Sequence, residues 1–180
     1  MASNLFTQLR TNIRKVVITA LSEYPTVPVI HSNSNGSEPA ESYVVVNILS
    51  ITQQGHHVTS SKLDIQNRQA TQVAYEVLVQ LSFIGSQSGD MSHSLNQRIN
   101  NNYLVFEDLK RNKLGIMRKS NVRRAPQKRD TKWVEYHNMD VTFSYIALTQ
   151  DVVDLIEAVV VEDVTADTIF RVPEGPIPVI

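Results

Sequence analysis

Residue types that support hydrolytic catalysis occur in this sequence, but their spacing does not match a known catalytic motif. Residues 85–89 read Gly-Ser-Gln-Ser-Gly, which is similar to the turn that carries the nucleophile of serine hydrolases. The central position of that turn must be serine, and here it is Gln87. We therefore interpret the segment as a turn between a strand and a helix. The sequence also has no P-loop and no Gly-x-Gly-x-x-Gly motif, so it predicts a protein that is not an enzyme.

The histidines do not form a metal-binding pattern. His56 and His57 are adjacent, and neighbouring residues of a strand point to opposite faces, so both rarely reach one ion. No other histidine or acid stands at the helical spacing that would complete a site. The chain has no cysteine, which excludes disulfides and thiolate zinc sites. We expect no metal and no cofactor, and we interpret His137 as a partly satisfied histidine of a sheet.

Charge is the most unusual feature of the composition. The net charge is only −1, but ten of the 17 basic residues lie between Lys110 and Lys132, where Asp130 is the only acid. From Asp151 onward acids dominate, and such asymmetry indicates an interaction surface. The candidate interface residues are Arg118, Lys119, Arg123, Arg124, Lys128, Arg129, Asp151, Asp154, Glu157, Glu162 and Asp163, together with the apolar Ile177, Val179 and Ile180 near the C-terminus.

Three interpretations of the basic stretch remain open. It could bind nucleic acid through phosphate contacts, pair with the acidic segment of another subunit, or form a solvated loop. Residues 114–132 contain no aromatic side chain on which a base could stack, and no DNA-reading motif is visible. We therefore favour the subunit and solvent interpretations over direct contact with nucleic acid.

The elements that must position these residues begin with an amphipathic helix over residues 4–24. Residues 43–51 are rich in β-branched side chains and predict a strand that is buried on both faces. Residues 53–68 form either a long hairpin or an exposed loop. The strict alternation of residues 72–83 predicts a half-buried strand, and a helix follows from Ser88 or Asp90 to an Asn triplet that ends it.

The C-terminal half begins with a short turn of helix over residues 103–109 and a strand over residues 114–117. Residues 133–148 predict a long strand whose apolar positions change from even to odd numbers, which suggests a β-bulge near His137 and Asn138. Residues 155–161 predict a last strand or short helix. The proline-rich tail is typical of an extended arm.

This order of elements predicts an α+β fold. We expect a mostly antiparallel or mixed sheet that is flanked by the N-terminal helix and one or two further helices. Residues 1–162 form the expected domain and residues 163–180 the expected arm. No apolar run is long enough to cross a bilayer and the N-terminus has no signal-peptide pattern, so we expect no membrane contact.

The pattern as a whole resembles the phage neck-terminator family, which is related in fold to the tail-terminator proteins of long-tailed phages. The resemblance covers roughly residues 4–162. It rests on the loop with Asn35-Gly36 and Pro39, on the strand entry at Tyr43, and on the alternating strand that ends at Gly85. Its most specific part is the signature of the long C-terminal strand, which comprises Trp133, Glu135, Asp140, Phe143 and Tyr145.

The resemblance implies a virion structural protein of the phage neck or tail, made in the host bacterial cytoplasm. Such a subunit forms a ring, usually of six copies, that caps the finished tail tube and meets the head-completion, or stopper, protein. DNA passes through the lumen, so non-specific contact with double-stranded DNA is possible. The role needs no catalytic group. The alternatives are another connector, stopper or tube-like subunit, or a DNA-binding accessory protein that uses the basic loop 110–132.

Two hypotheses follow for assembly. The basic loop, residues 118–132, meets the acids of residues 151–167 on the adjacent subunit, because a head-to-tail ring needs two different, complementary patches. The apolar end of the proline-stiffened arm is buried against a neighbouring subunit or the next ring.

Overall fold

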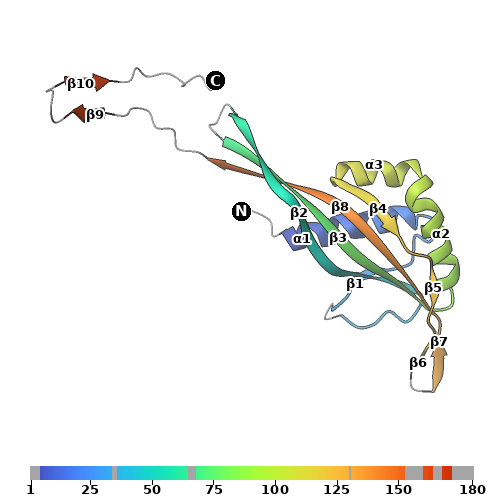
Figure 1. The fold of residues 1–180 in the computed structure, drawn as a ribbon. Coiled ribbons are helices and arrows are strands. Elements are labelled where there is room, and N and C mark those ends of the chain that lie inside the picture. The colour runs from blue at the N-terminus through green and yellow to red at the C-terminus, as the bar shows by residue number, and fades with distance from the viewer. Residues whose placement is uncertain are drawn as a thin grey trace. The chain divides into compact units, whose positions relative to one another are not determined.

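The computed structural model describes residues 5–33, 36–64, 68–129, 131–152, 160–163 and 168–171 (Figure 1). The helices are α1 (Leu5–Ala20), α2 (Ser88–Asn101) and α3 (Tyr103–Arg111). The longer strands are β2 (Tyr43–Leu63), β3 (Arg68–Ile84), β4 (Leu114–Lys119) and β8 (Tyr136–Val152). The shorter strands are β1 (Val29–His31), β5 (Arg123–Arg124), β6 (Gln127–Arg129), β7 (Lys132–Val134), β9 (Val160–Asp163) and β10 (Thr168–Arg171).

The chain divides into two compact units, which we describe separately. The first comprises residues 1–57 and 72–148, and the second comprises residues 58–71 and 149–180. Within the second unit β9 pairs with β10 in an antiparallel sheet, with Val161 opposite Phe170. Most of the expected strand or helix at residues 155–161, and the tail beyond Arg171, lie outside the described residues. The expected domain boundary between residues 162 and 163 stays a prediction.

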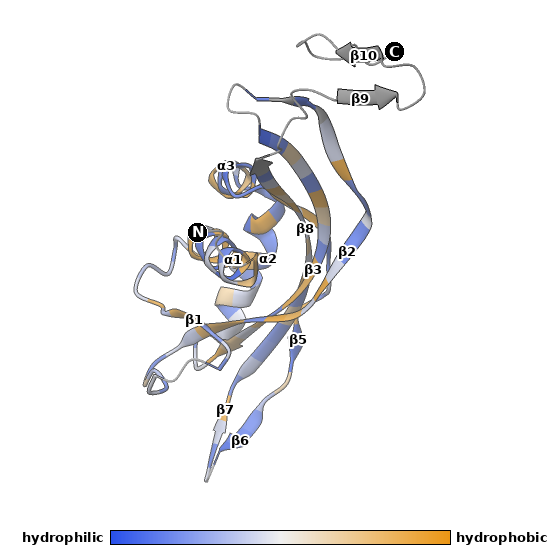
Figure 2. Cartoon of the chain, turned by 90° about the vertical axis from the view of Figure 1, so that its left-hand side faces the viewer, coloured by the Kyte–Doolittle hydropathy of each residue, from blue (hydrophilic) through white to orange (hydrophobic). Residues whose placement is uncertain are grey.

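The main sheet is mixed, as the sequence predicts. Its strand order is β1-β2-β3-β8-β4, and β5 also pairs with β8. β1 runs parallel to β2, whereas β4 and β5 run antiparallel to β8. The three helices lie on one side of this sheet (Figure 2). The fold class is therefore the α+β arrangement that the element order predicted.

The core forms between the helices and the inner face of the sheet. α1 buries residues at three- and four-residue steps, namely Leu9, Ile13, Val16, Val17 and Ala20. β3 buries every second residue from Val77 to Phe83, as its alternation predicted. β8 adds Met139, Val141 and Phe143, all without exposed surface, and α2 adds Met91, Leu95 and Ile99.

Asn102 separates two helices where the sequence predicted one helix and a short turn. Its extended backbone ends α2, and its side-chain oxygen accepts hydrogen bonds from the backbone N–H groups of Leu104, at 2.9 Å, and Val105, at 3.4 Å. This is an N-cap, which satisfies donors that a helix leaves unpaired. The Asn triplet therefore ends one helix and begins the next.

The change of apolar phase in β8 has a different cause from the predicted bulge. β5 pairs with His137 and Asn138 without a shift of register. Tyr136 is buried in a small second cluster with Tyr43 and Ile84, whereas the odd-numbered residues from Met139 are buried in the main core. The described register shift lies in β4, between Ile116 and Arg118.

Of the two structures predicted for residues 53–68, the long hairpin is the one that forms, because β2 extends to Leu63 and its neighbour β3 begins at Arg68. One correction concerns the beginning of β2. Residues 43–51 are buried on both faces only at their beginning. Val44 and Val46 belong to the main core, whereas Leu49 is exposed.

Shortening a core residue of β3 tests this arrangement. Leu81→Ala should lower the free energy of unfolding by about 2–5 kcal/mol, because it leaves a cavity in a fully buried site. Leu49→Ala is the matched control, since it removes the same atoms from a side chain that is 48% exposed, and it should cost less than about 1 kcal/mol. Denaturant unfolding measures both, and equal losses would contradict the described core.

Candidate subunit interface

The basic segment runs over β4, β5 and the β6–β7 hairpin. Arg118 and Lys119 end β4, Arg123 and Arg124 form β5, and Lys128 and Arg129 lie in β6. β6 pairs with β7 in a separate two-stranded sheet, with Lys128 opposite Trp133. The segment is therefore composed of short strands and their connections.

Four arginines of this segment, Arg118, Arg123, Arg124 and Arg129, pair with acids of the same chain. Arg118 forms an ion pair with Glu76 of β3 and also donates to the Thr142 hydroxyl at 3.2 Å. Arg123 forms an ion pair with Asp140. These guanidinium groups remain largely exposed, so the pairs orient side chains more than they stabilise the fold.

Arg124 makes a bidentate contact with Glu135. It donates from two nitrogens to the two carboxylate oxygens of Glu135, at 2.9 and 2.6 Å. Such bidentate geometry fixes the orientation of the guanidinium plane relative to the carboxylate plane. The hydrogen bond from Arg124 is the main cause that lowers the pKa of the Glu135 carboxyl group. β5 is thereby held against the start of β8.

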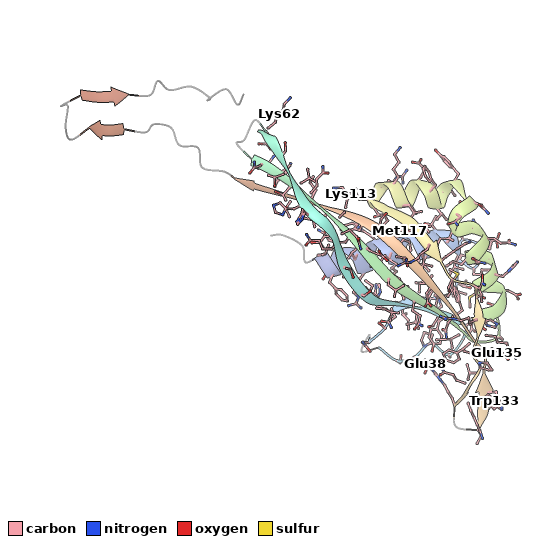
Figure 3. The ribbon with its side chains drawn as sticks, in the orientation of Figure 1. Glu38, Lys62, Lys113, Met117, Trp133 and Glu135 are labelled. Atoms are coloured by element: carbon pink, nitrogen blue, oxygen red, sulfur yellow. The ribbon has the colours of Figure 1, made fainter. Side chains whose placement is uncertain are left out.

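Arg129, at the turn end of the β6–β7 hairpin, connects the hairpin to the loop before β2 and to β8. It forms an ion pair with Glu38, donates to the Tyr136 hydroxyl, and places its guanidinium carbon 5.3 Å from the centroid of the Tyr136 ring. The Tyr43 hydroxyl also donates to Glu38. This network covers the second cluster, in which Tyr43, Ile84 and Tyr136 are buried (Figure 3 labels Glu38, Trp133 and Glu135 in this region).

The charges of this network shift two pKa values in opposite directions. Hydrogen bonds from Tyr43 and then from Arg129 lower the pKa of Glu38, because both favour its ionised form. Burial, followed by the hydrogen bond to Glu38, raises the pKa of Tyr43 to about 12. The network therefore favours ionised Glu38 beside a neutral Tyr43.

The long strand predicted over residues 133–148 is interrupted at Glu135, between β7 and β8, and its signature residues divide into three groups. Phe143 and Tyr145 are buried, and the Tyr145 hydroxyl lies 3.2 Å from the Gln8 side-chain oxygen of α1. Glu135 and Asp140 hold the arginines of β5. Trp133 has neither role, since it is 71% exposed on the hairpin. Among these residues it is the one available for contact with another molecule.

The arginines of the basic segment have acidic partners within the subunit. These partners are Glu38, Glu76, Glu135 and Asp140, whereas the expected pairing with acids of residues 151–167 concerns an adjacent subunit. Lys119 donates to the backbone oxygen of Asn96. The side chains of Lys128 and Lys132 form no hydrogen bond or ion pair with another residue in the described part of the chain.

Most acidic and apolar residues of the expected interface, or their side chains, lie outside the part of the chain that the structure describes. Asp151 belongs to β8, and Glu162 and Asp163 belong to β9, but their side chains lie outside what the structure describes. Asp154, Glu157, Ile177, Val179 and Ile180 lie outside the described residues altogether. Their contact with the basic segment of another subunit stays a prediction.

The turn that resembles a catalytic motif has a structural role. Gly85 has a φ of +102°, and a Cβ there would lie 2.8 Å from the Ser42 Cα, so other residues are strained at this position. The Ser42 hydroxyl accepts a hydrogen bond from the Gln87 backbone N–H at 3.1 Å. Ser88 is fully buried and lies 3.0 Å from Nδ1 of His137. His137 is thus a satisfied histidine of the sheet, as predicted.

A metal site is also not indicated. His56 and His57 lie exposed in β2. Within the described ranges, no group of three or more histidine, aspartate or glutamate side chains is arranged to hold an ion.

Comparison with known proteins gives one strong match. The family model described as phage neck terminator protein matches residues 4–170. No curated protein sequence matches the chain. The matched residues, 4–170, include all the strands and helices described above except the last residue of β10.

Two solved structures are similar to this chain at low identity. One is the sheath/tube terminator of an extracellular contractile injection system in its extended state, at 13% identity and a TM-score of 0.46, covering 86% of this chain. This chain spans 64% of the length of that one. The other, a protein without a descriptive name, has 11% identity, a TM-score of 0.39 and coverage of 85% of this chain and 100% of its own. Neither likeness carries a functional argument.

The pKa shift of Glu38 gives a testable pH dependence. Because its pKa is lowered from 4.5 in the folded state, the ionised carboxylate stabilises the fold above that pH, and this contribution is lost as the pH falls through the folded-state pKa. The Tm of the wild type should exceed that of Glu38→Gln at neutral pH, and the difference should shrink well below pH 4.5. Half of the Glu38 side chain is exposed, so the difference should be modest.

Glu41→Gln is the matched control for this experiment. Glu41 is exposed three residues away and has no hydrogen bond or ion pair to a described residue. Thermal unfolding followed by circular dichroism at several pH values provides the measurement. A difference between wild type and Glu38→Gln that stays constant with pH would show that the Arg129 network does not depend on the charge of Glu38.

Proposed function

Because the chain belongs to the phage neck terminator protein family, we propose that it acts as a ring subunit that caps the phage tail tube. In this role several copies, usually six, close into a ring after the tube is complete. The ring stops further addition of tube subunits and connects the tail to the head-completion, or stopper, proteins. DNA passes through its lumen during ejection.

The observation that carries the proposal is the extent of the family match. It covers residues 4–170 and so includes the helices, the main sheet and the basic segment together. The family is a structural one of the phage neck, which makes a virion component without catalysis the natural assignment. None of the described helices is long and apolar enough to span a membrane.

The hairpin supplies a physical reason for self-assembly. Trp133 is the only tryptophan of the chain and most of its side chain is exposed. Exposed aromatic side chains are unfavourable in water and are enriched at the centres of protein interfaces. A rigid hairpin that carries such a residue suits a contact with a neighbouring subunit or an axial partner.

The charges that remain available support a salt-dependent contact. The arginines from Arg118 to Arg129 have partners within the subunit, so Lys128 and Lys132 are the cations of the hairpin that can pair with acids elsewhere. Acids of residues 151–167 on an adjacent copy are the proposed partners. Screening weakens such exposed pairs, so assembly should loosen at high salt.

Other functions of the same surface make different predictions. A DNA-binding accessory protein would bind DNA as an isolated subunit, with an affinity that falls steeply with salt, because phosphate contacts release counterions. The same two lysines are the observation that favours this alternative. A stopper or tube-like subunit would assemble with different axial partners but would share the family fold.

The mass of the purified protein is the first prediction. Light scattering should give an oligomer, near six times the 20.3 kDa of one chain if the usual ring size holds, and negative-stain images should show rings with a central hole. Adding tail tubes should promote closure if the free subunit is a monomer. A protein that forms no ring alone and none on tube ends would refute the proposal.

Reversing the free charges of the hairpin is the second prediction. Lys128→Glu/Lys132→Glu should reduce assembly several-fold at low salt and leave the Tm of the subunit unchanged, since neither lysine has a described partner. Lys15→Glu/Lys62→Glu is the matched control, because both residues are exposed on other elements. Assembly that is insensitive to salt and to the hairpin reversal would exclude the charge-pairing interface.

A loss of DNA affinity separates the two uses of the hairpin. If the reversal abolished duplex binding by the subunit but left ring formation intact, the lysines would serve DNA contact rather than subunit pairing. Measurement of both properties on the same preparations distinguishes these outcomes.

A further inference from the structure

One edge of the main sheet is open. β4 stands at the end of the strand order, so its outer edge pairs with no described strand. Its first four residues are Leu114, Gly115, Ile116 and Met117, and the charged residues follow only at its end. Proteins usually cover, shorten or charge such an edge, because unpaired backbone groups there accept another strand.

The pairing of β4 with β8 fixes which backbone groups face outward. The Ile146 N–H donates to the Lys113 oxygen at 3.3 Å, so these two residues face each other across the pair. N–H and C=O groups of an antiparallel strand alternate between its two edges. Leu114 and Ile116 therefore present their N–H and C=O groups to the open edge.

Two hollows lie beside this edge, on the two faces of β4. One, of about 450 Å³, is bordered by Ser144, Ile146 and Leu148 of β8. The other, of about 420 Å³, is bordered by Ile99 of α2 and by Phe106 and Leu109 of α3. Both are mostly apolar, and Leu114 and Gly115 border both.

Gly115 leaves the space of the first hollow unoccupied. A Cβ at this position would lie 2.6 Å from the Ser144 hydroxyl oxygen, so a side chain would occupy the first hollow. A strand that lies along an edge sends alternate side chains to opposite faces of the sheet. Hollows on both faces of one short strand are therefore what an added apolar strand would fill.

The chain itself contains a segment with the matching pattern. Residues 174–180 read Glu-Gly-Pro-Ile-Pro-Val-Ile, with prolines at the alternate positions 176 and 178. In an extended strand, both prolines would face the same edge and leave it without N–H donors. Ile177 and Val179 would face the other edge with their donors intact. Such a segment can pair on one side only.

The charges near the hollows suit the same segment. Lys110 borders both hollows and Lys113 borders the first. Neither lysine has an ion pair within the described residues, and the segment brings Glu174. In a parallel addition, Glu174 would lie at the end of β4 that carries these lysines, and in an antiparallel addition it would lie near Lys119 at the other end.

We propose that residues 174–180 of a second copy of this chain add to β4 as an edge strand. Ile177 and Val179 form backbone hydrogen bonds with Leu114 and Ile116, and the side chains of the added strand fill the two hollows. Each subunit has one such edge and one such segment, which is the head-to-tail relation that closes a ring. The inference rests on the proposed function in that copies of the chain assemble.

The absence of cysteine makes cross-linking a clean test. One chain carries Val179→Cys, and a second chain of distinguishable mass carries Met117→Cys, at an exposed position in the bulge of β4 (Figure 3). The two are mixed at equal concentration and treated with a short bismaleimide reagent. Linked heterodimers should form several-fold faster than with Leu49→Cys in place of Met117→Cys.

Leu49 is a suitable control position because it has a similar exposure and lies in the same sheet. It belongs to β2, which β3 and β8 separate from β4. An Ile177→Cys chain provides a second arm position, and the Tm of each variant verifies that the subunit remains folded. Wild-type chain in excess should compete with the linking reaction.

Each outcome decides the inference. Oligomers without heterodimer links above the control would overturn the strand addition and leave the proposed function standing. A double variant, Met117→Cys/Val179→Cys, that links only within its own chain would overturn the role of a second copy. Links in open oligomers would support the strand addition but contradict a closed ring. The absence of both oligomers and links, with tail tubes present, would overturn both proposals.

Discussion

The burial of alternate residues along β8 is the constraint on which the rest of the fold depends. From Met139 to Tyr145 every second side chain enters the core beneath the helices. This burial places the even-numbered residues of the same stretch on the outer face of the sheet. It also determines the register in which β4 and β5 pair with β8. A shift by one residue would exchange the two faces, so Asp140 would enter the core and the arginine pairs would be lost. Core packing therefore sets the positions of the interface residues.

The fold was predictable where local patterns agree with tertiary packing. The alternation of β3 and the apolar face of α1 are buried as predicted because each pattern matches one continuous core. The bulge was expected in β8 because Tyr136 was assigned to the same core as Met139, whereas it packs in the second cluster. The ion pairs of Arg118 and Arg129 could not be foreseen, since Glu76 and Glu38 are distant in sequence. Glu135 and Asp140 offered a signal, because an antiparallel return places them beside β5.

The ion pairs of the basic segment reduce the net positive charge of its surface. A run of cations in sequence suggested a strongly positive surface, but carboxylates from β3, β8 and the loop before β2 neutralise the arginines. Within the described residues, the hairpin keeps two unpaired lysines and an exposed tryptophan, and Lys110 and Lys113 stay unpaired beside β4. Long-range attraction for DNA is weaker for such a surface than for the full segment, and a short-range contact with defined geometry is favoured.

A subunit that ends a polymer must bind its neighbours without offering a surface that accepts further copies. Sheet edges are the main risk, because each unpaired edge can template another strand. At one end of the sheet β1 pairs only with residues 44–46 of β2, and the polar residues from Thr52 to His57 leave the rest of that edge unattractive for an apolar strand. β4, at the other end, has six residues and an apolar beginning. A strand with prolines at alternate positions would satisfy β4 and leave an outer edge without donors. The proposed strand addition would therefore join copies and cover the β4 edge in the same step.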